Sequence, residues 1–186
     1  ANVTYLSEHK RAAFIGRVFQ DPMMGTAATM GIEENLALAK RRGKRRTLMP
    51  GIKRAEREEY RELLKTLGLG LENRLTSKVG LLSGGQRQRL LIARALADRP
   101  EILVLDNADS ALDYSTAAAL RQALRRDFPC TTLVIISERV SAVREADCIL
   151  VLENGRIDAQ GCHDALMASC RRYQRMAKLQ MGGDVG

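Results

Sequence analysis

The sequence has no tryptophan, an aromatic content of 4% and only two histidines, His9 and His163. Its four cysteines show no C-x-x-C spacing, so a zinc site is not expected. Nothing near the N-terminus resembles a secretory leader, and this, with the cysteine usage, fits a reducing cytoplasm. The longest apolar runs are far shorter than the roughly 18 residues that a bilayer span requires. We therefore expect no membrane-spanning helix.

The sequence also lacks G-x-x-x-x-G-K-[ST], the loop whose backbone amides and lysine hold nucleotide phosphates. The nearest imitation is Gly-Lys-Arg-Arg at 43–46. It lacks the first glycine at the required offset, lacks the hydroxyl after the lysine and follows no predicted strand. We do not interpret it as a phosphate loop.

The strongest functional signal that is present is the run Leu-Ser-Gly-Gly-Gln-Arg at 82–87, which precedes a long apolar helix. Adjacent Gly84 and Gly85 let the backbone approach an anion closely. Ser83 can cap the helix and offer its hydroxyl to a phosphate. The apolar run 102–105 follows and ends in Asp106, where a buried strand is predicted to emerge.

Together with Ser-Ala-Leu-Asp at 110–113, this order closely resembles the signature motif, Walker B strand and D-loop of ATP-binding cassette (ABC) proteins. The resemblance implies ATP and Mg²⁺ as cofactors. The signature residues Ser83, Gly84, Gly85 and Gln86 would close over the ATP of a partner domain, and Asp113 would contact that partner. Asp106 would hold Mg²⁺, usually through a water.

A Q-loop is expected at Gln20, within Val-Phe-Gln-Asp-Pro at 18–22. The resemblance implies that Gln20 lies near the nucleotide and Mg²⁺ and that its loop reports to membrane subunits. In the family the phosphate loop precedes this glutamine, and a strand, loop and helix need on the order of 30 residues. Only 19 residues stand before Gln20 and the chain opens with Ala1. We expect the front of the domain, with the phosphate loop, to be absent.

The two reacting positions depart from the family pattern. Asn107 follows Asp106 where the family normally has glutamate, and a neutral amide cannot take a proton from the attacking water. General-base catalysis contributes on the order of 10²–10⁴-fold. At the switch position, where the family usually has histidine, stands Glu138, a carboxylate that would repel a phosphate. This pattern resembles the degenerate half of asymmetric ABC exporters.

Periodicity predicts an α/β chain with a largely parallel sheet, in which strands and helices alternate after residue 100. We expect a single domain over 1–186. It divides into a partial core lobe at 1–20, a helical lobe carrying the signature motif at 21–99 and a RecA-like core lobe at 100–186. Strands are predicted at 12–20, 102–106, 131–137 and 148–153, the last turning through Asn154-Gly155 into 156–158. Helices are predicted at 31–40, 53–67, 84–98, 115–126, 141–145 and 163–180.

The two halves resemble different branches of the family. Residues 18–36 look like the ATPase of certain small-molecule importers, whereas the sequence from Arg89 onward looks like an exporter ATPase. The change falls near 86–90. Recombination, design or ordinary drift would each explain it.

The formal net charge is +8, and six basic residues fall within 40–46. A solvated loop between two helices is the interpretation we favour for this basic run. The alternatives are contact with anionic lipid headgroups, or with nucleic acid. The absence of aromatic residues among these cations weakens the nucleic-acid alternative.

The sequence thus predicts an ATP-binding and hydrolysing subunit of an ABC transporter, inactive as a lone chain. It would pair with a second nucleotide-binding domain and with membrane-spanning subunits, at the cytoplasmic face of the cell membrane. One alternative is a non-catalytic truncated or chimeric assembly module. A less favoured alternative is a nucleic-acid-associated ABC protein.

Overall fold

The structure is a computed structural model that describes residues 4–21, 23–42, 44, 51–68, 70–108, 112 and 114–180. The chain forms two compact units, Ala1–Ile136 and Ser137–Gly186. No helix in the described ranges is both long and apolar enough to cross a bilayer.

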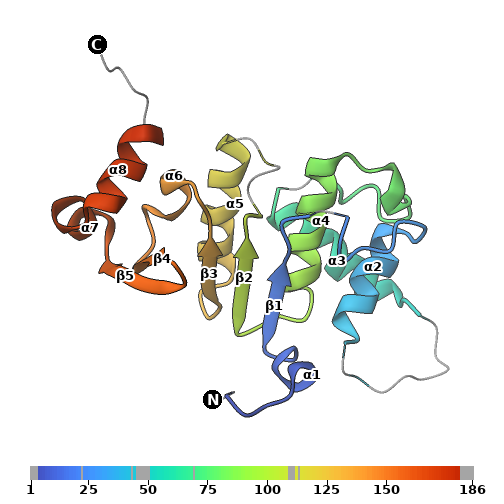
Figure 1. Cartoon of the computed structure of the whole chain (residues 1–186). Coiled ribbons are helices and arrows are strands. Elements are labelled where there is room, and N and C mark those ends of the chain that lie inside the picture. Colours follow the sequence, from blue (N-terminus) through green and yellow to red (C-terminus); the bar gives the residue numbers. More distant parts are fainter. Residues whose placement is uncertain are drawn as a thin grey trace. The chain divides into compact units, whose positions relative to one another are not determined.

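A three-stranded parallel sheet forms the centre of the first unit (Figure 1). Its strands are β1 (Ile15–Val18), β2 (Ile102–Asp106) and β3 (Thr132–Ile136), in that spatial order. The register places Arg17 beside Val104, and Val104 beside Val134. Because all three strands run the same way, the residues that follow them emerge at one end of the sheet.

Helices make up most of the rest of the first unit. They are α1 (Glu8–Arg11), α2 (Ile32–Lys40), α3 (Arg54–Thr66), α4 (Gly84–Leu96) and α5 (Tyr114–Asp127), with a short 3₁₀ turn at Val79–Leu81. Apolar residues recur along α4 at helical spacing, and Leu90, Leu91 and Ile92 are buried there. The main core joins these side chains to the sheet.

The two faces of the sheet differ in burial. Val18, Leu103 and Leu105 point into the core with α4 and α5, which lie behind the strands in Figure 1. The opposite face carries Arg17, and Val134 and Ile136 are 41% and 48% exposed there. This open face is where charged side chains of the strands can meet.

A single glycine lets α4 approach β1. A Cβ on Gly16 would lie 2.7 Å from the carbonyl oxygen of Ala95, near the end of α4. At the other end, Gln88 of α4 donates to the carbonyl of Phe19, which follows β1, at 3.4 Å. The helix therefore runs antiparallel to the strand, so that α4 begins at the end of the sheet where β1 finishes.

The second unit holds an antiparallel hairpin of β4 (Ile149–Glu153) and β5 (Arg156–Gly161). Asn154 and Gly155 form its turn with positive φ angles, as the Asn-Gly pair predicted. The unit also contains α6 (Val140–Val143), α7 (His163–Ser169) and α8 (Arg171–Gln180). Its core is a separate apolar cluster that includes Leu166 and Tyr173.

The predicted α/β fold with a parallel sheet is confirmed, while several elements differ locally. Helix α1 was not predicted, and β5 extends to Gly161 beyond the predicted 156–158. The first strand is shorter than the predicted range 12–20. The predicted helix 163–180 is broken, because Cys170 is extended and separates α7 from α8. The Ser169 hydroxyl donates to the Ala165 carbonyl at 2.7 Å, and such a bond competes with the helical ladder and bends helices.

We expect Gly16→Ala to lower the free energy of unfolding by about 1–3 kcal/mol, because the new methyl group would force α4 away from β1. Gly84→Ala is the matched control, since no atom lies within 4 Å of a Cβ there. Its stability should stay equal or rise slightly, as alanine favours helices. Urea unfolding followed by circular dichroism measures both, and equal stabilities would contradict the close approach.

Tyr60 of α3 is 1% exposed, and its hydroxyl has no hydrogen-bond partner among the described residues. Burial raises the pKa of Tyr60 to about 12, and the nearby Glu56 carboxylate adds to the effect. The folded protein therefore keeps the phenol neutral at pH values where the unfolded chain ionises it.

Because the unfolded state releases this proton first, stability should fall as pH rises from about 10 to about 12, by on the order of 2 kcal/mol. Tyr60→Phe should remove this loss and leave stability at neutral pH unchanged or slightly higher, since it deletes an unpaired buried hydroxyl. Urea titrations at pH 8 and 11 test both statements. A variant with the same alkaline loss as the parent would exclude Tyr60 as its source.

Candidate functional site

Three predicted site segments lie toward the same end of the sheet. β1 leads into Phe19 and Gln20, β2 ends at Asp106, and α4 begins directly after Ser83. The parallel pairing of β1 with β2 and the antiparallel course of α4 place these three ends on the same side of the sheet. Gln20 is exposed at this end.

Ser83 caps α4 as predicted. Its hydroxyl accepts from the Gln86 amide at 3.3 Å, and the Gln86 side-chain oxygen accepts from the Ser83 amide at 3.1 Å. This reciprocal arrangement is a capping box and fixes where the helix starts. The remaining first-turn amides and the helix dipole favour an anion at this position.

The two glycines of the motif are accessible. Gly84 is exposed with open space around it, and Gly85 is partly exposed. A glycine in a tightly packed interior would serve packing alone, whereas here a ligand can reach the backbone from outside. The geometry therefore fits a surface that accepts phosphate oxygens.

Two buried polar residues of α4 tie the motif to the neighbouring loops. Arg87 is 6% exposed; it donates to the Val79 carbonyl at 3.2 Å and contacts the Met23 sulfur. Gln88 is fully buried and bonds the Phe19 carbonyl. Arg87 and Gln88 therefore connect the loop around Gln20 with the first turns of α4.

Asp106 lies on the open face and forms an ion pair with Arg17 of β1, Nη2 to Oδ2 at 3.1 Å. The Asp106 side chain is 27% exposed, so a metal ion can reach it. No group of three acidic, histidine or cysteine residues gathers around a common point in the described part of the chain. One carboxylate fits Mg²⁺ that obtains its other ligands from phosphates and water, as this ion commonly does.

Asn107 has a left-handed backbone, with φ of 46°, and its amide donates to the Ile136 carbonyl at 2.9 Å. Asparagine adopts this region more readily than most residues. Asparagine at position 107, where the family normally has glutamate, thus also suits the left-handed backbone found there.

We expect Asn107→Glu to lower the free energy of unfolding by about 1 kcal/mol, because glutamate gains nothing that offsets the left-handed strain. Asn107→Gly should lose less, since glycine has no Cβ to strain. Thermal and urea unfolding of the two variants provide the comparison. A glutamate variant as stable as the parent would contradict the strain argument.

Two further residues were predicted for the site, Glu138 and Asp113. Glu138 is an exposed residue of the second unit, and its carbonyl accepts from the Gln180 side chain at 2.6 Å. Asp113, the predicted D-loop residue, lies outside the described residues. So does Pro22, which follows the Q-loop segment.

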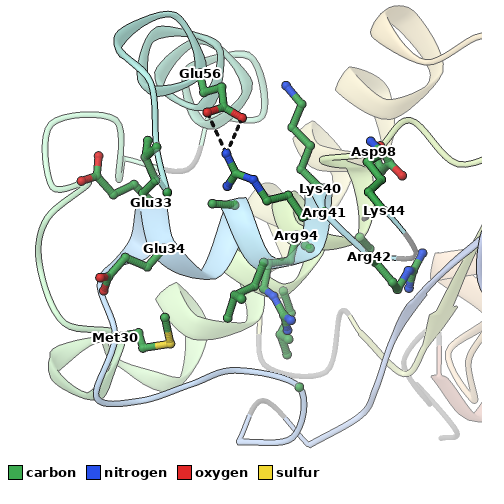
Figure 2. A pocket seen from close by; sticks show the side chains of 18 of the residues that line it. Met30, Glu33, Glu34, Lys40, Arg41, Arg42, Lys44, Glu56, Arg94 and Asp98 are labelled. Atoms are coloured by element: carbon green, nitrogen blue, oxygen red, sulfur yellow. Dashed lines mark hydrogen bonds and ion pairs between the residues drawn. The ribbon is translucent and has the colours of Figure 1, made fainter. Parts of the chain in front are cut away.

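A cavity of about 1510 Å³ in the first unit is lined by part of the basic run (Figure 2). Nη2 of Arg41 donates to both carboxylate oxygens of Glu56, as the dashed lines show, and Lys44 Nζ lies 2.6 Å from Asp98 Oδ1. The Lys53 amide, and after it Arg41, hold the pKa of Glu56 below its ordinary value.

Lys40 pairs with Glu59. Arg42 instead donates to the Ile15 carbonyl, and Arg94 donates to the Asn35 carbonyl. Burial, and then the charge of Arg42, lowers the pKa of Arg94. Much of the described basic run is thus neutralised internally, which weakens the lipid and nucleic-acid alternatives.

Reasoning from the sequence missed three residues of the candidate site, Arg17, Arg87 and Gln88. The signal for the last two was available, because long polar side chains on the apolar side of a helix must find partners there. Nothing in the sequence indicated that Arg17 would have a partner, since a charged residue within a strand usually faces water.

The family model described as ABC transporter matches residues 1–110. Multidrug resistance protein pgp-1 of Caenorhabditis elegans is 39% identical over 80% of this chain and 11% of its own length. The cyclolysin secretion/processing ATP-binding protein CyaB of Bordetella pertussis is 36% identical over 90% of this chain and 23% of its own. The chain thus spans less than a third of these curated relatives.

A solved structure of a bacterial Atm1-family ABC exporter with ATP bound superposes with a TM-score of 0.75 at 30% identity. The match covers 94% of this chain and 29% of the exporter chain. It agrees with the RecA-like α/β fold expected from the sequence.

Proposed function

This chain belongs to the ABC transporter family of ATP-binding proteins, and on that premise we propose that it supplies the signature motif of a composite ATP site at a dimer interface. The observation that carries the proposal is the exposed, capped start of α4 at Ser83 and Gly84. A motif that served only to begin a helix would not need two accessible glycines.

In this proposal the start of α4 acts as a lid on a nucleotide held by the partner domain. The first-turn amides and the helix dipole, equivalent to about half a positive charge, face the terminal phosphate. Gln86 keeps the serine in place through the capping box. Asp113 contacts the partner across the interface.

The site on the chain's own surface is proposed to be degenerate. Asp106 would bind the Mg²⁺ ion that accompanies the nucleotide, and Gln20 would lie near this ion. When bound, Mg²⁺ with ATP supplies the phosphoryl group that water attacks. Asn107 cannot accept the proton of that water, and Glu138 brings a negative charge to the switch position. We propose that turnover therefore depends on the partner's residues.

The membrane-spanning partners follow from the family. The segment after Gln20 is bonded to α4 through Arg87 and Gln88, which offers a route from the membrane subunits to the lid. We place the chain at the cytoplasmic face of a membrane, beside these subunits. The transported substrate and its direction depend on them.

The test pairs this chain with an ABC nucleotide-binding domain that carries its own phosphate loop. Sedimentation velocity with a slowly hydrolysed ATP analogue and Mg²⁺ should show a complex that is absent without nucleotide. Gly84→Asp should weaken it at least about tenfold, because a carboxylate would face the phosphates. The variant should still fold, since aspartate is favoured in a first helical turn.

Gly51→Asp is the matched control, because it adds the same charge at another exposed glycine with open space around it. The complex should survive this change. Phosphate release by the chain alone should stay at background. Nucleotide-dependent pairing that survives Gly84→Asp would overturn the proposed lid, and robust release by the lone chain would contradict the proposed dependence on a partner.

The second candidate is a non-catalytic assembly module, which the substitutions at Asn107 and Glu138 favour. It predicts association of the same strength with and without nucleotide. The sedimentation experiment therefore distinguishes the two candidates directly.

A further inference from the structure

Arg17 and Asp106 face each other across neighbouring strands on the open side of the sheet. Arg17 pairs in register with Val104, so Asp106 stands two residues further along β2 on the same face. The backbone thereby fixes both side chains within reach of each other, and their contact is 3.1 Å.

This ion pair is one-sided and accessible. It joins Nη2 to Oδ2, and the other carboxylate oxygen of Asp106 has no protein partner in the described ranges. The side chains are 54% and 27% exposed. Exposed pairs of this kind are held weakly and exchange readily with competing ions.

A second contact supports Arg17 independently of Asp106. Its guanidinium lies over the Phe19 ring, 4.7 Å from the ring centroid. A cation placed over an aromatic face is stabilised there. The Phe19 ring can therefore still stabilise the guanidinium when the Asp106 carboxylate binds another cation.

We propose that Arg17 is a built-in counter-ion that competes with Mg²⁺ for the Asp106 carboxylate. This inference rests on the proposed function, in which Asp106 binds Mg²⁺. Without nucleotide, Arg17 pairs with the Asp106 carboxylate and thereby weakens the binding of a divalent ion to it. When a metal ion takes the carboxylate, the guanidinium is released toward Phe19.

The experiment uses Mn²⁺ as a probe for Mg²⁺, without nucleotide or partner domain. The electron paramagnetic resonance signal of free Mn²⁺ reports binding to the full chain. Arg17→Gln should bind Mn²⁺ up to about fivefold more tightly than the parent at the Asp106 site. Adding Asp106→Asn to this variant should abolish the gain.

Arg99→Gln is the matched control for net charge. Arg99 is exposed and precedes β2, whereas Asp106 ends this strand, so its removal should leave Mn²⁺ binding at Asp106 unchanged. Arg17→Lys keeps a cation and should stay close to the parent. If Arg17→Gln fails to fold, Arg17→Thr repeats the test with a side chain suited to strands.

Equal or weaker Mn²⁺ binding by the charge-neutral Arg17 variant overturns the proposal, as does a gain that persists with Asp106→Asn. Because the titration contains neither ATP nor a partner, its failure leaves the nucleotide-dependent pairing untouched. Conversely, a sedimentation result that contradicts the proposed lid would leave the measured competition between Arg17 and Mn²⁺ unaffected.

Discussion

The packing of α4 along β1 is the constraint on which the arrangement of the candidate site depends. Gly16 permits the approach by leaving no Cβ between the strand and the Ala95 carbonyl. Gln88 fixes the opposite end of the helix against Phe19. The start of α4 is thereby held at the same end of the sheet as Gln20 and Asp106, although these segments are far apart in sequence.

The same packing divides the sheet into two faces with different tasks. The covered face buries Val18, Leu103 and Leu105 and contributes the hydrophobic stabilisation. The open face carries the Arg17–Asp106 pair. Burial on this face contributes little to stability, and side chains there can exchange partners. A carboxylate on the covered face would have to be paired permanently, so the accessible face is the one suited to a transient metal.

Much of this arrangement could be predicted from the sequence. Alternating apolar segments indicated the parallel sheet, Asn154-Gly155 indicated the hairpin, and the serine before two glycines indicated a helix start. These signals are local, because each depends on backbone preferences within a few residues. The comparisons confirm the family, while the roles of the site residues remain predictions.

What the sequence could not provide was set by contacts between distant residues. Arg17 meets Asp106 across 89 positions, and Arg87 meets Met23 across 64. The extended backbone of Cys170 separates α7 from α8, and the helical periodicity of 163–180 gives no sign of this break. The left-handed backbone of Asn107 follows from how β2 leaves the sheet beside Ile136.

The proposed lid and the altered position 107 rest on separate sets of interactions in this fold. The lid depends on a capping box within one helical turn and on the contact of α4 with β1. Asn107 depends on the end of β2 and its bond to β3. Because no residue is shared between these two sets of interactions, a substitution at position 107 leaves the start of α4 unstrained. Asparagine at position 107 is therefore compatible with the proposed role of the start of α4 at a partner's nucleotide.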